Sequence, residues 1–172
     1  MTAPRDTLLH VVDQGRVLSF GLDDLNRYHG PEAPGGVAHG FVVMCRAWPL
    51  LCPEGPPERR AIRLDTAFPG PGVRDAVELV TRAVTGQRYL VDPALGRPDR
   101  GATLERYVFR FGYRDKTVTL LIRPGFVTDE FIALSRTPGR TDAQEAHLTV
   151  LKQEMADRLL SVPADQVYDI AG

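Results

Sequence analysis

The chain has 172 residues, 43% of them hydrophobic, and a formal net charge of -1 from 21 basic and 22 acidic residues. This length and apolar content predict one compact domain with a sizeable core, spanning residues 1–172. The balanced charge gives no electrostatic reason to expect nucleic acid or an anionic membrane as a partner. No apolar run reaches the roughly 18 residues that a membrane-spanning helix needs.

The start of the chain, "MTAPRDTLLHVV", does not have the pattern of a secretory signal. The two cysteines, Cys45 and Cys52, fall in one predicted helix. A rise of about 1.5 Å per residue separates their Cα atoms by roughly 10 Å, which is beyond disulfide reach. We therefore expect two buried, reduced thiols in a cytoplasmic protein.

The first third of the chain predicts two helices. After a short N-terminal segment with a turn at Gly15, a short helix is expected, capped by Ser19 or Asp23. Pro34 starts a longer helix with apolar residues at the 3.6-residue period, and "CPEGPPE" ends it. Its first turns contain three glycines, each costing about 1 kcal/mol relative to alanine, so either a backbone or a ligand is expected to pack closely there. These glycines are Gly35, Gly36 and Gly40.

The rest of the chain alternates between strands and helices. "AIRLDTA" (61–67) predicts a strand, and a helix over 73–84 is expected to end at Gly86. Residues 93–104 predict a loop, and the alternation around "RDK" predicts a hairpin over 106–123. Helices are expected near 129–135 and 142–161, with a final strand in "DQVYDI". This order predicts an α+β fold, in which helices cover a largely antiparallel sheet.

The run "FGLDDLNRYHGPEAPGGVAHG" resembles the start of the FmdE-like family, which is named for a component of formylmethanofuran dehydrogenase. The family hallmark is a His-Gly-His-x-Cys-Pro-Gly run, followed by a further glycine at the mouth of a helix. The chain retains five of these positions, which are His29, Gly30, Pro34, Gly35 and Gly40.

Three further segments resemble the family in the same order. "GVRDAVELVTRAVTG" is similar to its Asp-Ala helix ending in Thr-Gly, and the hairpin "VFRFGYRDKTVTLLI" and the closing "RLLSVPADQVYDI" are similar to its last part. The resemblance covers about residues 18–170. It implies one FmdE-like domain and a homodimer.

The departures fall on the family's zinc ligands. Pro31 and Ala33 replace the second His and the Cys of the hallmark, and Gly72, Val73 and Arg74 leave no counterpart for a later Cys. The Cys-rich zinc ribbon that some members append also has no counterpart before the last residue. Zinc sites in proteins need about four Cys, His or carboxylate ligands, or three and water. We therefore expect no zinc cofactor; if any metal binds, His29 and His39 are the candidate ligands.

Three polar residues near the first helix mouth are candidates for chemistry. His29 is the candidate acid/base, or the one retained ligand, because its ordinary pKa suits proton transfer near neutral pH. The alternative is a histidine that only hydrogen-bonds its loop. For His39 we favour a partly exposed helix residue over a replacement ligand, and Glu32 is either a carboxylate of the site or an ordinary surface glutamate.

Asp65 and Thr66 form a second candidate group at the end of the predicted strand 61–67. Side chains at strand ends next to a Gly/Pro turn often line sites, because the strand fixes them while the loop leaves them accessible. The alternative for Asp65 is a carboxylate that caps the turn. For Asp75, in the first turn of the second glycine-opened helix, the helix dipole alone explains an acidic residue.

Two classes of function remain open. The first is a small-molecule enzyme on an FmdE-like scaffold, with His29 and Asp65 as catalytic candidates. Its small polar or anionic substrate would bind at two converging helix N-termini, with His29 at the rim. The expected binding residues are Glu32, Gly35, Gly36, Thr66 and Gly72. The second class is a non-catalytic accessory protein of a metal- or pterin-cofactor pathway.

Other common catalytic motifs have no match in the sequence. There is no Gly-x-Ser-x-Gly elbow, no P-loop and no Rossmann fingerprint, so serine acyl transfer, nucleotide hydrolysis and hydride transfer to a nicotinamide lack support. An aromatic row in the hairpin adds to the expectation of a homodimer, because it offers more apolar surface than one small domain readily covers. The row consists of Tyr107, Phe109, Phe111 and Tyr113.

Overall fold

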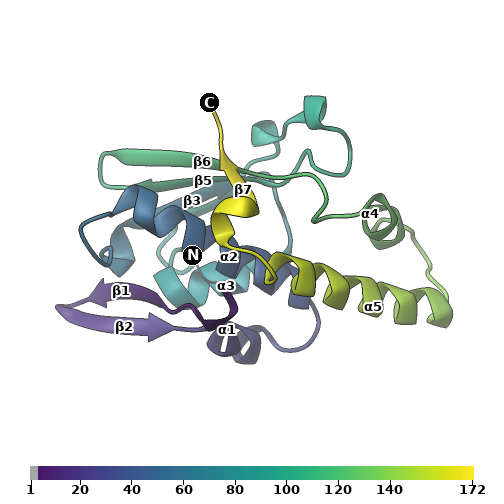
Figure 1. The fold of residues 1–172 in the computed structure, drawn as a ribbon, viewed down its shortest axis with the longest axis horizontal. Coiled ribbons are helices and arrows are strands. Elements are labelled where there is room, and N and C mark those ends of the chain that lie inside the picture. The colour runs from purple at the N-terminus through teal and green to yellow at the C-terminus, as the bar shows by residue number, and fades with distance from the viewer. Residues whose placement is uncertain (1–3) are drawn as a thin grey trace.

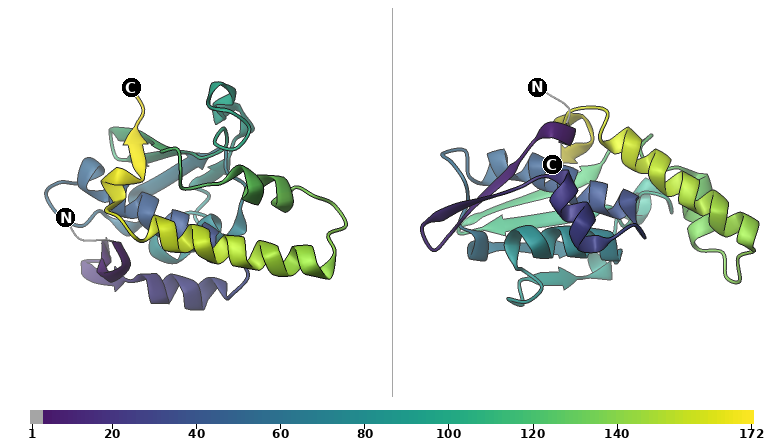
Figure 2. Two further views of the ribbon diagram at one scale, coloured as in Figure 1. Left: turned by 45° about the vertical axis from the view of Figure 1, so that its right-hand side comes forward. Right: turned by 90° about the horizontal axis from the view of Figure 1, so that it is seen from below.

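A computed structural model describes residues 4–172, which form an α+β fold with α1, α2 and α3 on one side of the main sheet and α4 and α5 extending past its end (Figures 1 and 2). Helices α2 and α3 pack under the sheet, and α1 with a separate two-stranded hairpin lies beneath them (Figure 1). The helices are α1 (Leu22–His29), α2 (Pro34–Leu51), α3 (Pro71–Thr81), α4 (Asp129–Ser135) and α5 (Asp142–Leu159). The strands are β1 (Leu9–Asp13), β2 (Arg16–Phe20), β3 (Ile62–Thr66), β4 (Tyr89–Val91), β5 (Val108–Tyr113), β6 (Lys116–Ile122) and β7 (Tyr168–Ile170).

The main sheet has the strand order β4-β3-β5-β6-β7 and is largely antiparallel, as predicted. Only β3 and β4 run parallel, because α3 crosses over between them. The predicted hairpin is β5–β6, in which Phe111 pairs with Val118. Period-two alternation directs the aromatic side chains of β5 toward the helices, where apolar side chains belong.

The aromatic row is covered within the chain. Its four side chains are between 0% and 4% exposed, and the Trp48 ring of α2 packs edge-on against Phe111 with centroids 5.9 Å apart. The sequence-based argument that this row needs a second subunit to cover it is therefore wrong. Helix α2 provides the cover because it is apolar around most of its circumference, as expected of a central helix.

The N-terminal segment forms the hairpin β1–β2, which the sequence analysis did not predict. Gln14 and Gly15 both have positive φ, as in the two-residue turns that join antiparallel strands, and Gly15 is the residue by which the sequence marks this turn. The predicted caps of α1, Ser19 and Asp23, are also wrong. The N-cap is Gly21, whose backbone N–H donates to the carboxylate of Asp24 at 2.8 Å.

Glycines allow α2 and α3 to cross with their backbones in contact. A Cβ atom added at Gly72 would lie 2.8 Å from the carbonyl carbon of Gly36, and one added at Gly40 would lie 2.7 Å from the Cβ of Ala76. Gly35 packs under Met155 of α5. Of the two explanations for these glycines, close backbone packing is the one that the structure supports.

Several boundaries differ from the prediction. Helix α3 begins at Pro71 and ends at Thr81, because Arg82 has left-handed backbone angles and ends the helix before Gly86 is reached. Strand β4 was not predicted, since three residues are too few for a periodic signal. The loop 93–104 contains two short 3-10 turns, at Pro93–Leu95 and Pro98–Arg100.

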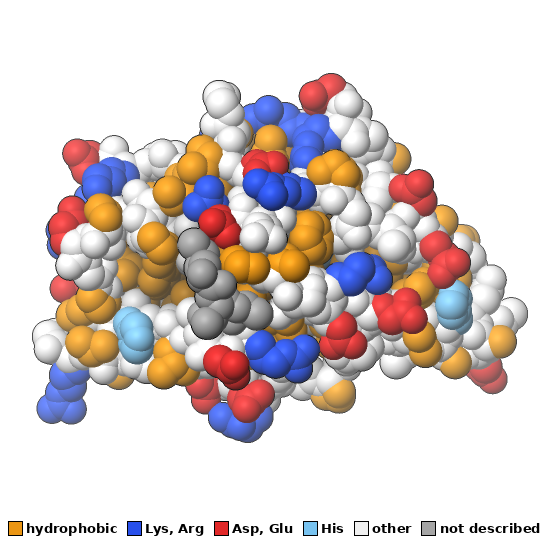
Figure 3. All heavy atoms as spheres, in the orientation of Figure 1, with side chains coloured by type: hydrophobic (Ala, Val, Ile, Leu, Met, Phe, Trp, Pro, Cys, Tyr) orange, Lys and Arg blue, Asp and Glu red, His pale blue; other side chains and the backbone are white. Residues whose placement is uncertain are grey.

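The surface shown in Figure 3 has basic and acidic side chains interspersed over the same elements. Among the described residues, no strongly one-signed patch covers this face, in line with the balanced composition. Within residues 4–172, no helix is long and apolar enough to cross a bilayer.

Candidate functional site

The N-termini of α2 and α3 meet at a cavity of about 390 Å³. Gly36 and Gly72 line it from the two helices, and their backbones are in contact at its base. The remaining walls come from the turn before α3, the segment before β5, and from α4 and α5, which extend past the end of the sheet (Figures 1 and 2). The size falls within the usual range of small-molecule sites.

Neither helix N-terminus at the cavity has a side-chain cap. The N-cap residues are Ala33 and Gly70, neither of which offers a capping oxygen. By contrast, Thr128 and Thr141 cap the outlying helices α4 and α5 through their hydroxyls. Apart from Pro34 and Pro71, which have no N–H, the first residues of each helix therefore have amide groups without an intrahelical acceptor.

Three basic residues are among those that line the cavity, and they are Arg106, Arg136 and Lys152. Lys152 donates from Nζ to the backbone carbonyl of Glu32 at 3.1 Å, so it lies against the α1–α2 loop. Glu32 is the one acidic residue among those lining the cavity, which gives the lining three basic residues against one acidic residue. Both the side chains and the helix dipoles therefore favour an anion here.

An aromatic wall closes the side of the cavity nearest the sheet. The rings of Phe68 and Tyr107 have centroids 4.8 Å apart, and Tyr107 packs against the imidazole of His39 at 4.9 Å. His39 Nδ1 is 2.6 Å from the hydroxyl of Tyr168, which fixes the wall from behind. His39 is fully buried, so the expectation of a partly exposed residue is wrong; burial lowers its pKa to about 3, so the imidazole is neutral near pH 7.

His29 pairs with Asp75, a partner that sequence reasoning missed. His29 Nδ1 lies 2.7 Å from Oδ2 of Asp75 on α3, and the His29 side chain is 4% exposed. Its Nε2 is buried without a hydrogen-bond partner among residues 4–172, and so is the hydroxyl of Tyr89. Burial is the main cause that raises the pKa of the Tyr89 hydroxyl. The positive charge of Arg74 lowers this pKa, and the nearby Asp75 carboxylate raises it.

This histidine is not among the residues that line the cavity. Asp75 follows Gly72 by three positions on α3, a rise of about 4.5 Å, so the His29–Asp75 pair lies roughly one helical turn from the cavity mouth. The sequence-based interpretation placed His29 at the rim as an ordinary surface residue. The burial of its side chain shows that this assumption is wrong.

Asp65 and Thr66 do not line the cavity either. Asp65 forms an ion pair with Arg110 at 2.6 Å on the outer face of the sheet. Thr66 points into the core, where its hydroxyl donates to the carbonyl of Val108 at 2.6 Å and accepts from the amide of Phe68 at 3.0 Å. Thr66 thus helps to position one aromatic residue of the wall.

The positions that resemble the zinc ligands of FmdE-like proteins carry few ligand atoms here. Pro31 and Ala33 carry no ligand atoms, and His29 is engaged by Asp75 on one nitrogen. In the described part of the chain, no three His, Cys, Asp or Glu side chains are grouped so that they could hold a metal ion. His39, the other metal candidate, lies in the aromatic core behind the cavity wall.

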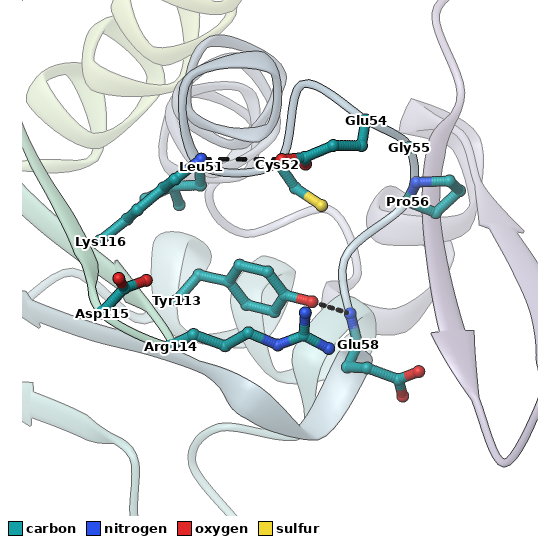
Figure 4. Close-up of a pocket in the computed structure, with 10 residues that line it drawn as sticks. All are labelled: Leu51, Cys52, Glu54, Gly55, Pro56, Glu58, Tyr113, Arg114, Asp115 and Lys116. Carbon is teal, nitrogen blue, oxygen red and sulfur yellow. Dashed lines mark hydrogen bonds and ion pairs between the residues drawn. The ribbon is translucent and has the colours of Figure 1, made fainter.

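A second cavity, of about 510 Å³, lies between the end of α2 and the β5–β6 turn (Figure 4). The Tyr113 hydroxyl accepts from the amide of Glu58 at 3.1 Å, and Lys116 approaches Glu54 at 3.9 Å. Burial and Glu54 raise the pKa of the Cys52 thiol, so it is not an activated nucleophile. The described residues that line this cavity combine no α-helix N-termini with their charged groups, so the first cavity remains the better candidate site.

Comparison with known proteins gave no match, either to a protein-family model or to a curated protein. The site residues that sequence reasoning missed come from segments far apart in the chain. Arg106, Tyr107, Phe131, Arg136 and Lys152 follow no short motif that would have indicated a common site. Only the two Pro-Gly helix starts, at Pro34 and Pro71, signalled this location in advance.

Proposed function

We propose that this chain is a small-molecule enzyme on an FmdE-like scaffold, with a substrate whose anionic group binds between the N-termini of α2 and α3. The observation that carries the proposal is the convergence of two uncapped helix N-termini on one cavity with three basic side chains in its lining. The amide groups, the helix dipoles and the basic side chains each attract an anion, so their contributions to anion binding add.

In this proposal His29 is the acid/base group. A carboxylate bonded to Nδ1 fixes the imidazole ring and its tautomer, which leaves Nε2 as the nitrogen without a partner among residues 4–172. Because this nitrogen is buried and His29 does not line the cavity, the proposal requires the reacting part of the substrate to reach past the helix mouths to His29. The same carboxylate stabilises the imidazolium after the proton has been taken up. Asp65 takes no part, because Arg110 neutralises it on the other face of the sheet.

A non-catalytic accessory protein of a metal- or pterin-cofactor pathway is the second candidate. It is favoured by the position of His29, which lies outside the lining of the cavity. The cavity would then hold a ligand without turnover. The substitution His29→Gln separates the two functions, since ligand binding should persist in both cases and only an enzyme would lose turnover.

Anion binding is testable with inorganic phosphate as the probe. We expect the backbone amide signals of Gly36 and Gly72 to shift and saturate in an NMR titration at constant ionic strength. Arg136→Gln should weaken binding at least about tenfold, since charge-assisted hydrogen bonds contribute about 1.5–3 kcal/mol. The matched control is Arg16→Gln on the exposed strand β2. Glycine amides that do not respond, or equal affinities in all three proteins, would refute the anion site.

A homodimer and a cytoplasmic location are also proposed. The dimer rests on the family resemblance, and the location rests on the unpaired cysteines Cys45 and Cys52. Multi-angle light scattering should report about twice the monomer mass of 19.0 kDa at micromolar protein. A constant monomer mass up to millimolar concentration would contradict the dimer.

A further inference from the structure

We propose that the ligand of the cavity between α2 and α3 is a planar aromatic anion, with an arenecarboxylate as the simplest example. This inference rests on the proposed anion-binding function and adds the chemistry of the rest of the ligand. The helix mouths and basic side chains would hold the charged group, and the aromatic side of the cavity would hold the ring.

The cavity offers a ring more contact than charge recognition requires. Phe68 and Tyr107 line it from the side of the sheet, and Phe131 and Ile132 line it from α4. Met155 of α5 adds a thioether, which makes favourable contacts with aromatic rings. A site for a small inorganic anion would not need these five apolar side chains, so their presence indicates a ligand with an apolar body.

The aromatic wall is closely packed and carries no charge near neutral pH. Tyr107 is held between Phe68 and His39, with ring centroids 4.8 and 4.9 Å apart. The His39–Tyr168 hydrogen bond of 2.6 Å anchors this stack to the last strand. Side chains that are already packed in place lose little entropy on binding, and the half-buried Phe68 ring offers an aromatic ligand an offset or edge-to-face contact. This favours a planar body over a flexible aliphatic chain.

The three basic side chains of the lining come from three different segments of the chain. Arg136 caps α4, Lys152 lies on α5, and Arg106 immediately precedes the wall residue Tyr107. An arginine beside a ring site can also stack its guanidinium on the bound ring. A ligand that carries both an anionic group and an aromatic ring can contact the basic side chains and the apolar side chains of the cavity at the same time.

Four probes of matched size or charge separate the parts of this proposal. Benzoate is planar and anionic, cyclohexanecarboxylate is anionic but not planar, benzamide is planar but neutral, and acetate is the charged group alone. Binding is measured by the same NMR titration at constant ionic strength. We expect benzoate to bind about tenfold more tightly than cyclohexanecarboxylate or benzamide, and acetate to bind most weakly.

Each outcome has a distinct meaning. Equal affinity for acetate and benzoate would refute the aromatic inference and leave the anion site intact. Equal affinity for benzamide and benzoate would refute the anion site and leave the ring site. Absence of benzoate binding at tens of millimolar, or tighter binding of cyclohexanecarboxylate, would overturn the inference outright.

A substitution on α4 provides the independent check. Phe131→Ala should weaken benzoate binding about tenfold and leave acetate binding unchanged, because Phe131 is half-buried and supplies apolar contact only. The control is Val150→Ala on α5, whose side chain is 51% exposed and does not line the cavity. Unchanged benzoate affinity in the folded Phe131→Ala protein would contradict the inference.

Discussion

Replacing His39 should remove a large part of the acid sensitivity of this protein. Burial lowers the pKa of His39 in the folded state to about 3, from an ordinary value of 6.5. Below pH 6.5 the unfolded chain therefore takes up a proton that the folded state does not. The free energy of unfolding should fall by about 1.4 kcal/mol per pH unit as the pH drops from 6.5 toward 3, and be independent of this group above 6.5. At pH 5 the loss amounts to about 2 kcal/mol.

The comparison needs a background in which the hydrogen bond to Tyr168 is already gone. His39→Leu alone would leave the Tyr168 hydroxyl buried and unpaired, a separate cost of about 1–3 kcal/mol. We therefore compare Tyr168→Phe with the double variant His39→Leu/Tyr168→Phe by urea unfolding between pH 8 and 4. The two curves should diverge below pH 6.5, whereas His147→Gln, on an exposed histidine, should leave the divergence unchanged. Parallel curves would show that the pKa of His39 is not lowered by folding.

The second large effect is expected at Gly72. A Cβ atom there would lie 2.8 Å from the carbonyl carbon of Gly36 and 2.8 Å from the amide nitrogen of Val37, both of which are backbone atoms. Alanine gains up to about 1 kcal/mol in helix propensity, but overpacking against a fixed backbone costs about 1–3 kcal/mol. The whole α2–α3 crossing must shift to relieve the contact, so the cost of overpacking should exceed the gain in helix propensity. We expect Gly72→Ala to lower the free energy of unfolding by about 2 kcal/mol.

Urea unfolding measures this effect through the transition midpoint. The matched control is Gly55→Ala, since a Cβ at Gly55 meets nothing within 4 Å and its φ is not positive. That control should be neutral or slightly stabilising, because alanine restricts the unfolded chain. A Gly72→Ala protein as stable as the control would mean that the helices separate at little cost. The glycines would then need another explanation, such as the close approach of a ligand.

These two residues illustrate the limits of sequence reasoning at the site. The cost of glycines in the first turns of a helix predicted a close approach at Gly35, Gly36 and Gly40, but not its partner. The partner helix is more than thirty residues away, and only the folded crossing identifies Gly72 as the contact. Likewise, the sequence placed His39 on a helix, but its burial depends on how many neighbours surround that helix.

By itself, the sequence determined the class of the fold and the position of the helix mouths. Period-two alternation in residues 106–123, the 3.6-residue period of α2, and the Pro-Gly starts at Pro34 and Pro71 are local signals, since each acts within a few residues of the chain. The tertiary structure alone decided which side chains meet at those mouths. Arg136 and Lys152 reach the cavity because α4 and α5 extend past the sheet, and His29 meets Asp75 because α1 packs on α3. Such contacts depend on how segments far apart in the sequence pack together and on how deeply each side chain is then buried. The sequence of a single segment does not indicate either property.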